Sequence, residues 1–172
     1  MTTIPGMTEI RGAGTSETWR KDAAKAAFNA AWDLIYRRDR EPDHDAEMLV
    51  AACASRYLWE GVGGDEQRTV GDWQVAHVAS LLGDAALALR FAARSLAIVE
   101  ANGWSDWRLA SALEGMARAF ATAGDGEARD SYAARCREVL ATMTDREDRV
   151  LIASQLATVP GIEAAPAEGT TE

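Results

Sequence analysis

The sequence predicts an all-α fold, a stack of three helical hairpins with a period of about 41 residues and a C-terminal capping helix. One repeated dipeptide and one repeated tripeptide first indicate this period. Gly-Asp recurs at 83–84 and 124–125, and Ala-Ala-Arg recurs at 92–94 and 133–135. Apolar residues also recur at spacings of three and four, and no stretch alternates like a strand. Self-similarity at a fixed period of this length is typical of helical repeat proteins.

The first hairpin is expected between Ser16 and Trp59. Ser16 is a suitable N-cap for a helix that runs to about Arg38. Pro42 interrupts the chain, and the second helix runs from about Asp43 to Trp59. The apolar positions of the first helix are Ala24, Ala27, Phe28, Ala31, Leu34 and Ile35.

The second hairpin follows a glycine-rich stretch at 60–71, which we interpret as a loop. Its first helix is expected at about 72–82. Gly83 ends that helix, and the second helix occupies about 84–101, because glycine is favoured just beyond a helix C-terminus.

The third hairpin begins after a connection at 102–107, where Ser105 or Asp106 is a suitable cap. Its first helix runs to about Ala123, Gly124 turns the chain, and the second helix covers about 125–142. Thr144 and Glu147 form a predicted capping box that opens a last helix at about 145–157. The expected organisation is a flexible N-terminal arm, one helical domain and a disordered C-terminal tail, at residues 1–15, 16–158 and 159–172.

The repeat extends to a third copy one period earlier, where Pro42-Asp43 and Ala51-Ala52 take the corresponding places. This register predicts that small residues are buried equivalently at helix crossings, and that larger residues just before them fill the gap to the next hairpin. The small residues are Ala52, Ala93 and Ala134, and the larger ones are Val50, Phe91 and Tyr132. The last helix aligns with the first helix of a fourth unit and is expected to cover the open end of the stack.

The composition excludes several classes of partner. The formal net charge is -9, which repels nucleic acid phosphates and anionic lipids, so neither is an expected partner. Cys53 and Cys136 belong to no CxxC pair and are interpreted as small buried thiols in a reducing cytoplasm. The sequence has neither a signal peptide nor an apolar run of about 18 residues, so no membrane association is expected.

The pattern resembles the tetratricopeptide repeat. The match consists of a small residue, Gly-Asp at the turn, a small residue, an aromatic residue and a leucine, at Ala76, Gly83-Asp84, Ala88, Phe91 and Leu96. The period exceeds the usual one of about 34 residues. The stretch from Gly71 to Asp125 is also similar to an uncharacterised bacterial family of stand-alone tetratricopeptide-like proteins, with which no activity is associated. The resemblance implies a right-handed α-solenoid.

The resemblance also implies that the first helix of each hairpin lines a concave face. The residues placed on that face are Trp32 and Tyr36 with Asn29, then Trp73, His77 and Ser80, and then Glu114 and Arg118 with Ser111. Glu114 is expected to pair either with Arg118 or with His77, and pairing with His77 would raise the histidine pKa. The alternative is structural: the tryptophans belong to the core and Glu114–Arg118 is an intrahelical pair.

The sequence favours a non-enzymatic scaffold that binds a protein or peptide or associates with itself. It contains no GxSxG, HExxH, P-loop or GxGxxG motif, so no catalytic residue, cofactor or metal is expected. The alternative is a small-molecule sensor or enzyme with a pocket around Trp73, His77, Glu114 and Arg118. Trp104 and Trp107 form a second candidate interface. His44, with Asp45 and Glu47 beside it, does not make a metal site, because the ligands would come from one helix start.

Overall fold

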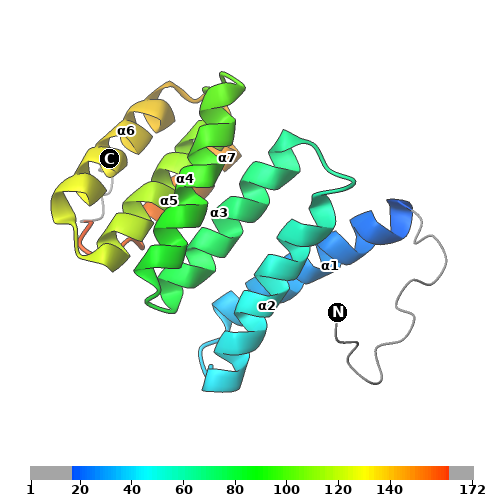
Figure 1. The fold of residues 1–172 in the computed structure, drawn as a ribbon. Helices are drawn as coiled ribbons and strands as arrows, with labels where there is room; N and C mark the ends of the chain where they lie inside the picture. Colours follow the sequence, from blue (N-terminus) through cyan, green and yellow to red (C-terminus); the bar gives the residue numbers. More distant parts are fainter. Residues whose placement is uncertain (1–16, 163–172) are drawn as a thin grey trace, which may run out of the picture.

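A computed structural model describes residues 17–162 as seven α-helices, and no strand occurs among these residues (Figure 1). The helices are α1 (Glu17–Tyr36), α2 (Pro42–Trp59), α3 (Asp65–Leu81), α4 (Ala85–Ala101), α5 (Trp107–Ala123), α6 (Gly126–Thr142) and α7 (Arg146–Leu156). The all-helical prediction is therefore confirmed. The predicted arm at 1–15, the Ser16 cap and residues 163–172 of the predicted tail lie outside the described residues.

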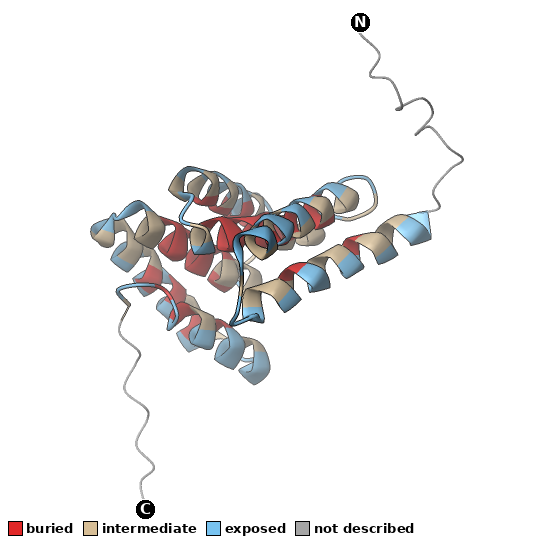
Figure 2. Cartoon of the chain, turned by 90° about the horizontal axis from the view of Figure 1, so that it is seen from below, coloured by how far each residue is buried: buried red, intermediate tan, exposed pale blue. Residues whose placement is uncertain are grey.

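Neighbouring helices pack in pairs. Helix α1 packs against α2, α3 against α4, and α5 against α6, while α3 and α5 also contact each other. Helix α7 packs against α5 and α6. Figure 2 shows that the buried residues lie where the helices face one another, and that the beginning of α1 extends away from the rest. Val159, in the predicted tail, is 2% exposed and belongs to the core around α5 and α6.

The turns follow the predicted glycines. Gly83 and Gly124 adopt positive φ angles of 76° and 77°, a conformation that favours glycine. Asp84 and Asp125 then cap α4 and α6, because their carboxylates accept hydrogen bonds from the Leu87 and Ala128 backbone N–H groups. The same Gly-Asp pair therefore ends one helix and begins the next in both copies.

One predicted helix start and one predicted cap were wrong. Helix α3 begins at Asp65, seven residues before the predicted start at Asp72, so much of the glycine-rich stretch is helical. Gln67 Oε1 accepts a hydrogen bond from Gly64 N–H at 2.9 Å, which caps this start. At α7 the cap is Asp145, whose carboxylate accepts from two backbone N–H groups, and not the expected Thr144.

The predicted burial register was wrong by one residue in two copies. Ala52 is buried, but Ala93 and Ala134 are exposed, and the buried alanines are Ala92 and Ala133. The 41-residue spacing therefore holds between α4 and α6, whereas α2 and α4 are related by 40 residues. The connection between α1 and α2 is longer than the later turns and enters α2 through Pro42, which moves α2 along by one residue.

Val50 does not fill the gap between hairpins, because it is 68% exposed. Phe91 and Tyr132, the equivalent large residues, are partly buried and pack against the core. The shift of α2 by one residue turns Val50 to the surface, since a step of one position rotates a side chain by about 100° around a helix.

Polar side chains connect the helix layers. Gln74 on α3 donates a hydrogen bond to the Phe28 carbonyl of α1 at 3.0 Å. The carboxylate of Asp72, which is fully buried, accepts hydrogen bonds from Arg56 of α2 and Arg94 of α4.

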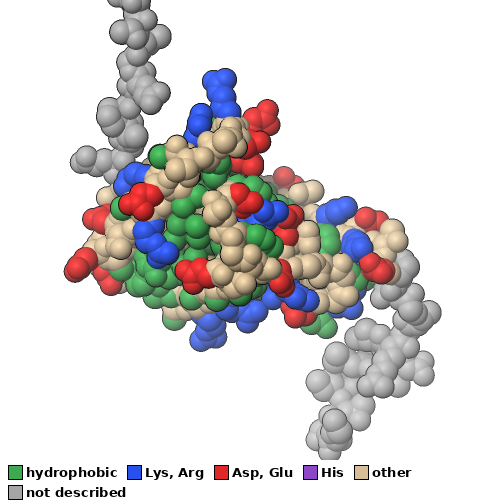
Figure 3. All heavy atoms as spheres, turned by 90° about the horizontal axis from the view of Figure 1, so that it is seen from above, with side chains coloured by type: hydrophobic (Ala, Val, Ile, Leu, Met, Phe, Trp, Pro, Cys, Tyr) green, Lys and Arg blue, Asp and Glu red, His purple; other side chains and the backbone are tan. Residues whose placement is uncertain are grey.

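Among the described residues, no helix is both long enough and apolar enough to cross a membrane. On the face seen in Figure 3, basic and acidic side chains are interspersed around hydrophobic ones, without an extended basic patch.

Candidate functional site

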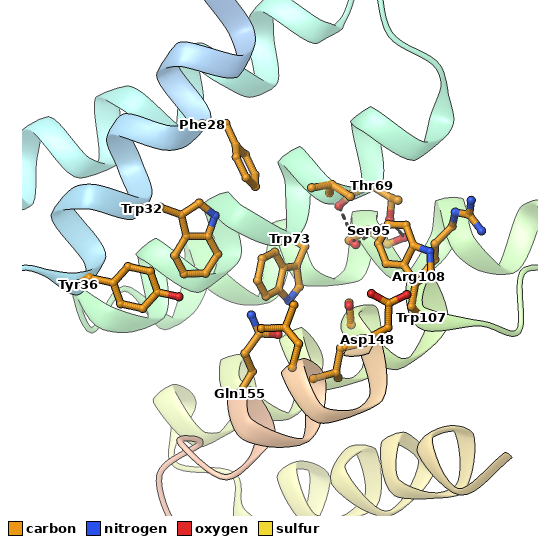
Figure 4. A pocket seen from close by; sticks show the side chains of 14 residues that line it. Phe28, Trp32, Tyr36, Thr69, Trp73, Ser95, Trp107, Arg108, Asp148 and Gln155 are labelled. Carbon is orange, nitrogen blue, oxygen red and sulfur yellow. Dashed lines mark hydrogen bonds between the residues drawn. The ribbon is translucent and has the colours of Figure 1, made fainter. Parts of the chain in front are cut away.

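A pocket of about 580 Å³ lies between the first helices of the three pairs and α7. Figure 4 shows the side chains of α1 across the pocket from those of α7, with Trp73 of α3 at its centre. The lining consists of Phe28, Trp32 and Tyr36 from α1, Thr69, Val70 and Trp73 from α3, Ser95 from α4, Trp107, Arg108 and Ser111 from α5, and Asp148, Leu151, Ile152 and Gln155 from α7.

Aromatic side chains form one wall. Phe28, Trp32 and Tyr36 are spaced four residues apart on α1, so they share one helix face. The Trp32 ring lies 5.4 Å from the Tyr36 ring in a stacked arrangement and 5.8 Å from the Trp73 ring, measured between centroids. Tyr36 is 72% exposed, so this wall reaches the surface.

Trp73 is held in place from behind the pocket. Its indole Nε1 donates a hydrogen bond to Glu114 Oε2 at 2.9 Å. Glu114 is fully buried, and its other carboxylate oxygen accepts from Arg118 Nε at 2.8 Å. Gly115 provides the space for this contact, since a Cβ atom there would lie 2.8 Å from Trp73 Cδ1.

Arg118 extends the same chain of hydrogen bonds to α7. Its Nη2 donates to the Gln155 carbonyl and to Thr158 Oγ1, each at 2.8 Å. Trp73, Glu114 and Arg118 therefore connect α3, α5 and the end of α7. Glu114 and Arg118, which were predicted to face the groove, lie behind its wall and determine the position of the residues that line it.

His77 does not pair with Glu114. It lies between Trp32 and Trp73, with ring centroids 5.6 and 5.4 Å away, and is buried. Burial, the larger cause, and the nearby Arg118 charge together lower the pKa of His77 to about 4, while the Glu114 charge opposes the shift. Of the two expected partners, Glu114 pairs with Arg118, so the condition under which the pKa of His77 would be raised is not met.

Neither His77 nor Ser80 lines the pocket. The buried atoms His77 Nδ1 and Ser80 Oγ have no hydrogen-bond partner among the described residues. The predicted concave face thus divides into the pocket residues Trp32, Tyr36, Trp73 and Ser111, and a layer behind them that contains His77, Glu114 and Arg118.

Trp104 and Trp107 enclose the guanidinium of Arg108. The Arg108 Cζ atom lies 4.7 Å from the Trp104 ring centroid and 4.9 Å from that of Trp107. Both rings are partly buried against the core, and Trp107 also lines the pocket. Arg108 forms ion pairs with Glu66 and Asp106.

Two of the hydroxyl groups in the lining, those of Thr69 and Ser95, bind each other. Thr69 Oγ1 and Ser95 Oγ are 2.8 Å apart, and each also bonds to the other residue's backbone carbonyl (Figure 4). Both residues are buried. Their hydrogen-bonding capacity is therefore used within the protein, and the pocket surface is predominantly apolar there.

Two smaller hollows adjoin the pocket. One, of about 400 Å³, shares Phe28 and Val70 with it and continues along α1 and α3 to Trp59. The other, of about 170 Å³, shares Trp107 and Asp148 with it and reaches the connection between α6 and α7. The pocket and the two adjoining hollows together form a groove.

Metal binding finds no support in the described part of the chain, where no group of three or more His, Cys, Asp and Glu side chains is placed to hold an ion. His44 instead caps α2, since its Nδ1 accepts a hydrogen bond from Glu41 N–H at 3.0 Å. Asp45 pairs with Arg40. The expectation of a buried thiol is wrong for Cys53, which is exposed on α2. Cys136 is buried, and burial raises the pKa of its thiol to about 12, so this thiol stays protonated.

The pocket residues on α7 were not predicted from the sequence. The 41-residue period was a signal for them, because Asp148 and Ile152 follow Trp107 and Ser111 by 41 residues and all four line the pocket.

Comparison of the chain with protein-family models, with curated proteins and with solved structures gives no match. The function must therefore be argued from the geometry of the groove.

Proposed function

We propose that this protein is a non-enzymatic binding module, a tetratricopeptide-like stack of helical hairpins whose groove takes up a segment of another protein. The observation that carries the proposal is the groove itself, an apolar pocket that two more polar hollows extend, one between α1 and α3 and the other toward the connection between α6 and α7. Stacked helical pairs present extended concave surfaces suited to peptide segments. The paired helices and the Gly-Asp turns support the tetratricopeptide-like arrangement.

The chemistry of the lining favours binding over catalysis. A general acid or base must reach the reacting atoms of a substrate. His77 and Glu114, the sequence-based candidates, are buried outside the lining, and Glu114 is bound to Trp73 and Arg118. Thr69 and Ser95 bind each other. The exposed surface of the pocket therefore offers mainly aromatic and aliphatic contacts.

A sensor for a small apolar molecule is the second candidate. The volume of about 580 Å³ lies within the range of small-molecule pockets, about 300–1,000 Å³. The adjoining hollows favour a longer occupant, because a compact molecule would leave them empty. Thermal-shift measurements with a library of small apolar compounds would support the sensor if binding stabilised the protein in a Trp73-dependent manner.

Two neighbouring residues on α7 allow a controlled test. Leu151 and Val150 are 53% and 58% exposed, but only Leu151 lines the pocket. Leu151→Arg introduces a large charged side chain into the groove, whereas Val150→Arg makes a similar change outside it. Neither substitution removes a buried side chain, so both variants should fold.

The experiment is selection of random peptides displayed on phage against the native protein, followed by affinity measurement of synthetic peptides. We expect enriched peptides to bind the native protein and Val150→Arg equally and Leu151→Arg at least tenfold more weakly, since a desolvated charge opposes apolar burial. Equal binding to both variants, or no enrichment, would refute a peptide groove. Dimerisation that only Leu151→Arg abolishes in sedimentation experiments would identify a second copy as the occupant.

A further inference from the structure

We infer that the occupant of this groove is a peptide segment with a basic side chain, Lys or Arg, which pairs with Asp148 beside Trp107. The inference rests on the proposed function, because it specifies the chemistry of the segment that the groove binds. It follows from the two charged residues in the lining of the pocket, Arg108 and Asp148.

The single basic residue in the lining of the pocket is already neutralised. Arg108 forms ion pairs with both Glu66 and Asp106, and Trp104 and Trp107 cover its guanidinium. This group of three charges is net negative. Arg108 is therefore not available to an acidic ligand, which would have to displace a carboxylate.

Asp148 differs from the other acidic residues at this end of the groove. Asp106 and Asp145 use their carboxylates to cap α5 and α7, each accepting backbone N–H groups. The Asp148 carboxylate makes no hydrogen bond or ion pair with any described residue, although Asp148 is partly buried and lines both the pocket and the smaller hollow beside it. A partly desolvated carboxylate without a partner is complementary to a cation.

The far side of the pocket is uncharged. Figure 4 places Tyr36 on the opposite side of the pocket from Trp107 and Arg108, and the lining on that side comes from Trp32, Tyr36 and Gln155. An occupant that fits both sides carries its basic group at the start of α7 and its aromatic or aliphatic side chains along α1. The net charge of -9 also attracts a basic segment over longer distances.

The test is a charge exchange at Asp148. Random peptides are selected in parallel on the native protein, on Asp148→Lys and on the control Glu138→Lys, which changes an exposed charge on α6 that has no ion pair. We expect the native protein and the control to enrich peptides with Lys or Arg at one position relative to their apolar residues. Asp148→Lys should enrich Asp or Glu at that position.

A double-mutant cycle then assigns the contact. The basic residue of the strongest peptide is replaced by norleucine, which should weaken binding to the native protein about tenfold and binding to Asp148→Asn little or not at all. Circular dichroism establishes that each variant is folded.

The outcomes separate the two proposals. Peptides that bind in a Leu151-dependent manner but show no basic preference, or the same preference with Asp148→Lys, overturn the inference and leave the peptide groove intact. An equal norleucine effect on the native protein and Asp148→Asn also overturns it. Failure to enrich any Leu151-dependent peptide overturns both.

Discussion

Trp73 Nε1 donates a 2.9 Å hydrogen bond to Glu114 Oε2, between residues one 41-residue period apart on α3 and α5. The same carboxylate binds Arg118, which reaches the end of α7. A fully buried charged pair contributes little net stability by itself, because desolvation offsets the attraction, but removing one partner leaves an uncompensated charge. The pair therefore maintains the relative positions of three groove-forming helices.

Replacing Glu114 should destabilise the protein strongly. Glu114→Gln leaves the buried Arg118 guanidinium without a counter-charge, and we expect a loss of about 3–5 kcal/mol in the free energy of unfolding. Urea denaturation followed by circular dichroism measures it. The matched change at the exposed Glu138 should stay within about 0.5 kcal/mol. Equal stabilities of the two variants would show that Arg118 finds another partner.

Substitution of Gly115 tests the packing of the Trp73 ring against α5. An added Cβ would lie 2.8 Å from Trp73 Cδ1, so Gly115→Ala should overpack the pocket wall at a cost of about 1–3 kcal/mol. That exceeds the gain of about 1 kcal/mol expected for Ala over Gly within a helix. The control is Gly126→Ala on α6, where the new Cβ would be 3.5 Å from Arg129 Nη2, an ordinary contact. Thermal melts should give Gly115→Ala a lower melting temperature than Gly126→Ala. Equal melting temperatures of the two variants would contradict the close approach of Gly115 to Trp73.

Two adjacent alanines on α4 differ in burial, and substitutions at the two positions should therefore differ in their effect on stability. Ala92 is buried and Ala93 is exposed. Ala92→Leu should cost about 1–3 kcal/mol by overpacking a helix crossing, whereas Ala93→Leu should change stability by less than about 0.5 kcal/mol. Equilibrium denaturation of the two single variants is sufficient. A larger loss for Ala93→Leu would restore the register expected from the sequence.

Local signals in the sequence predicted most of the fold. Gly83 and Gly124 end helices because only a few residue types adopt positive φ readily, and the aspartates that follow are strong caps. The start of α3 was missed because glycines at 61, 63, 64 and 71 suggested a loop. In the structure Gly71 lies inside the helix, where a Cβ would be 2.8 Å from Arg56 Cδ. This requirement for glycine comes from packing against another helix, so the residues next to Gly71 in the sequence do not predict it.

The candidate site was predicted in part for the same reason. The resemblance to tetratricopeptide repeats placed Trp32, Tyr36 and Trp73 on one concave face, and all three line the pocket. It could not distinguish this lining from the layer behind it, because Glu114 and Arg118 occupy equivalent helix positions. Their burial depends on contacts with other helices: Trp73 of α3 binds Glu114, and the Gln155 carbonyl of α7 and Thr158, just beyond it, accept hydrogen bonds from Arg118.

His77 should make the stability depend on pH. Its pKa is about 4 in the folded protein and about 6.5 when unfolded, because burial and Arg118 disfavour the charged imidazolium. Between these values the unfolded state binds more protons, so stability falls as the pH is lowered. The contribution is complete above pH 6.5, is lost progressively down to about pH 4, and amounts to roughly 3 kcal/mol.

The measurement compares urea denaturation of the native protein and His77→Gln from pH 7 to pH 4. Carboxylates also titrate in this interval, but they do so in both proteins, so the difference between the two curves isolates His77. We expect the native protein to lose more stability than the variant over this interval, whatever the variant's stability at pH 7. Parallel curves, or an NMR titration that gives His77 a pKa near 6.5, would mean that the imidazole is accessible to water. In that case His77 would belong to the groove surface and not to the buried layer behind Trp73.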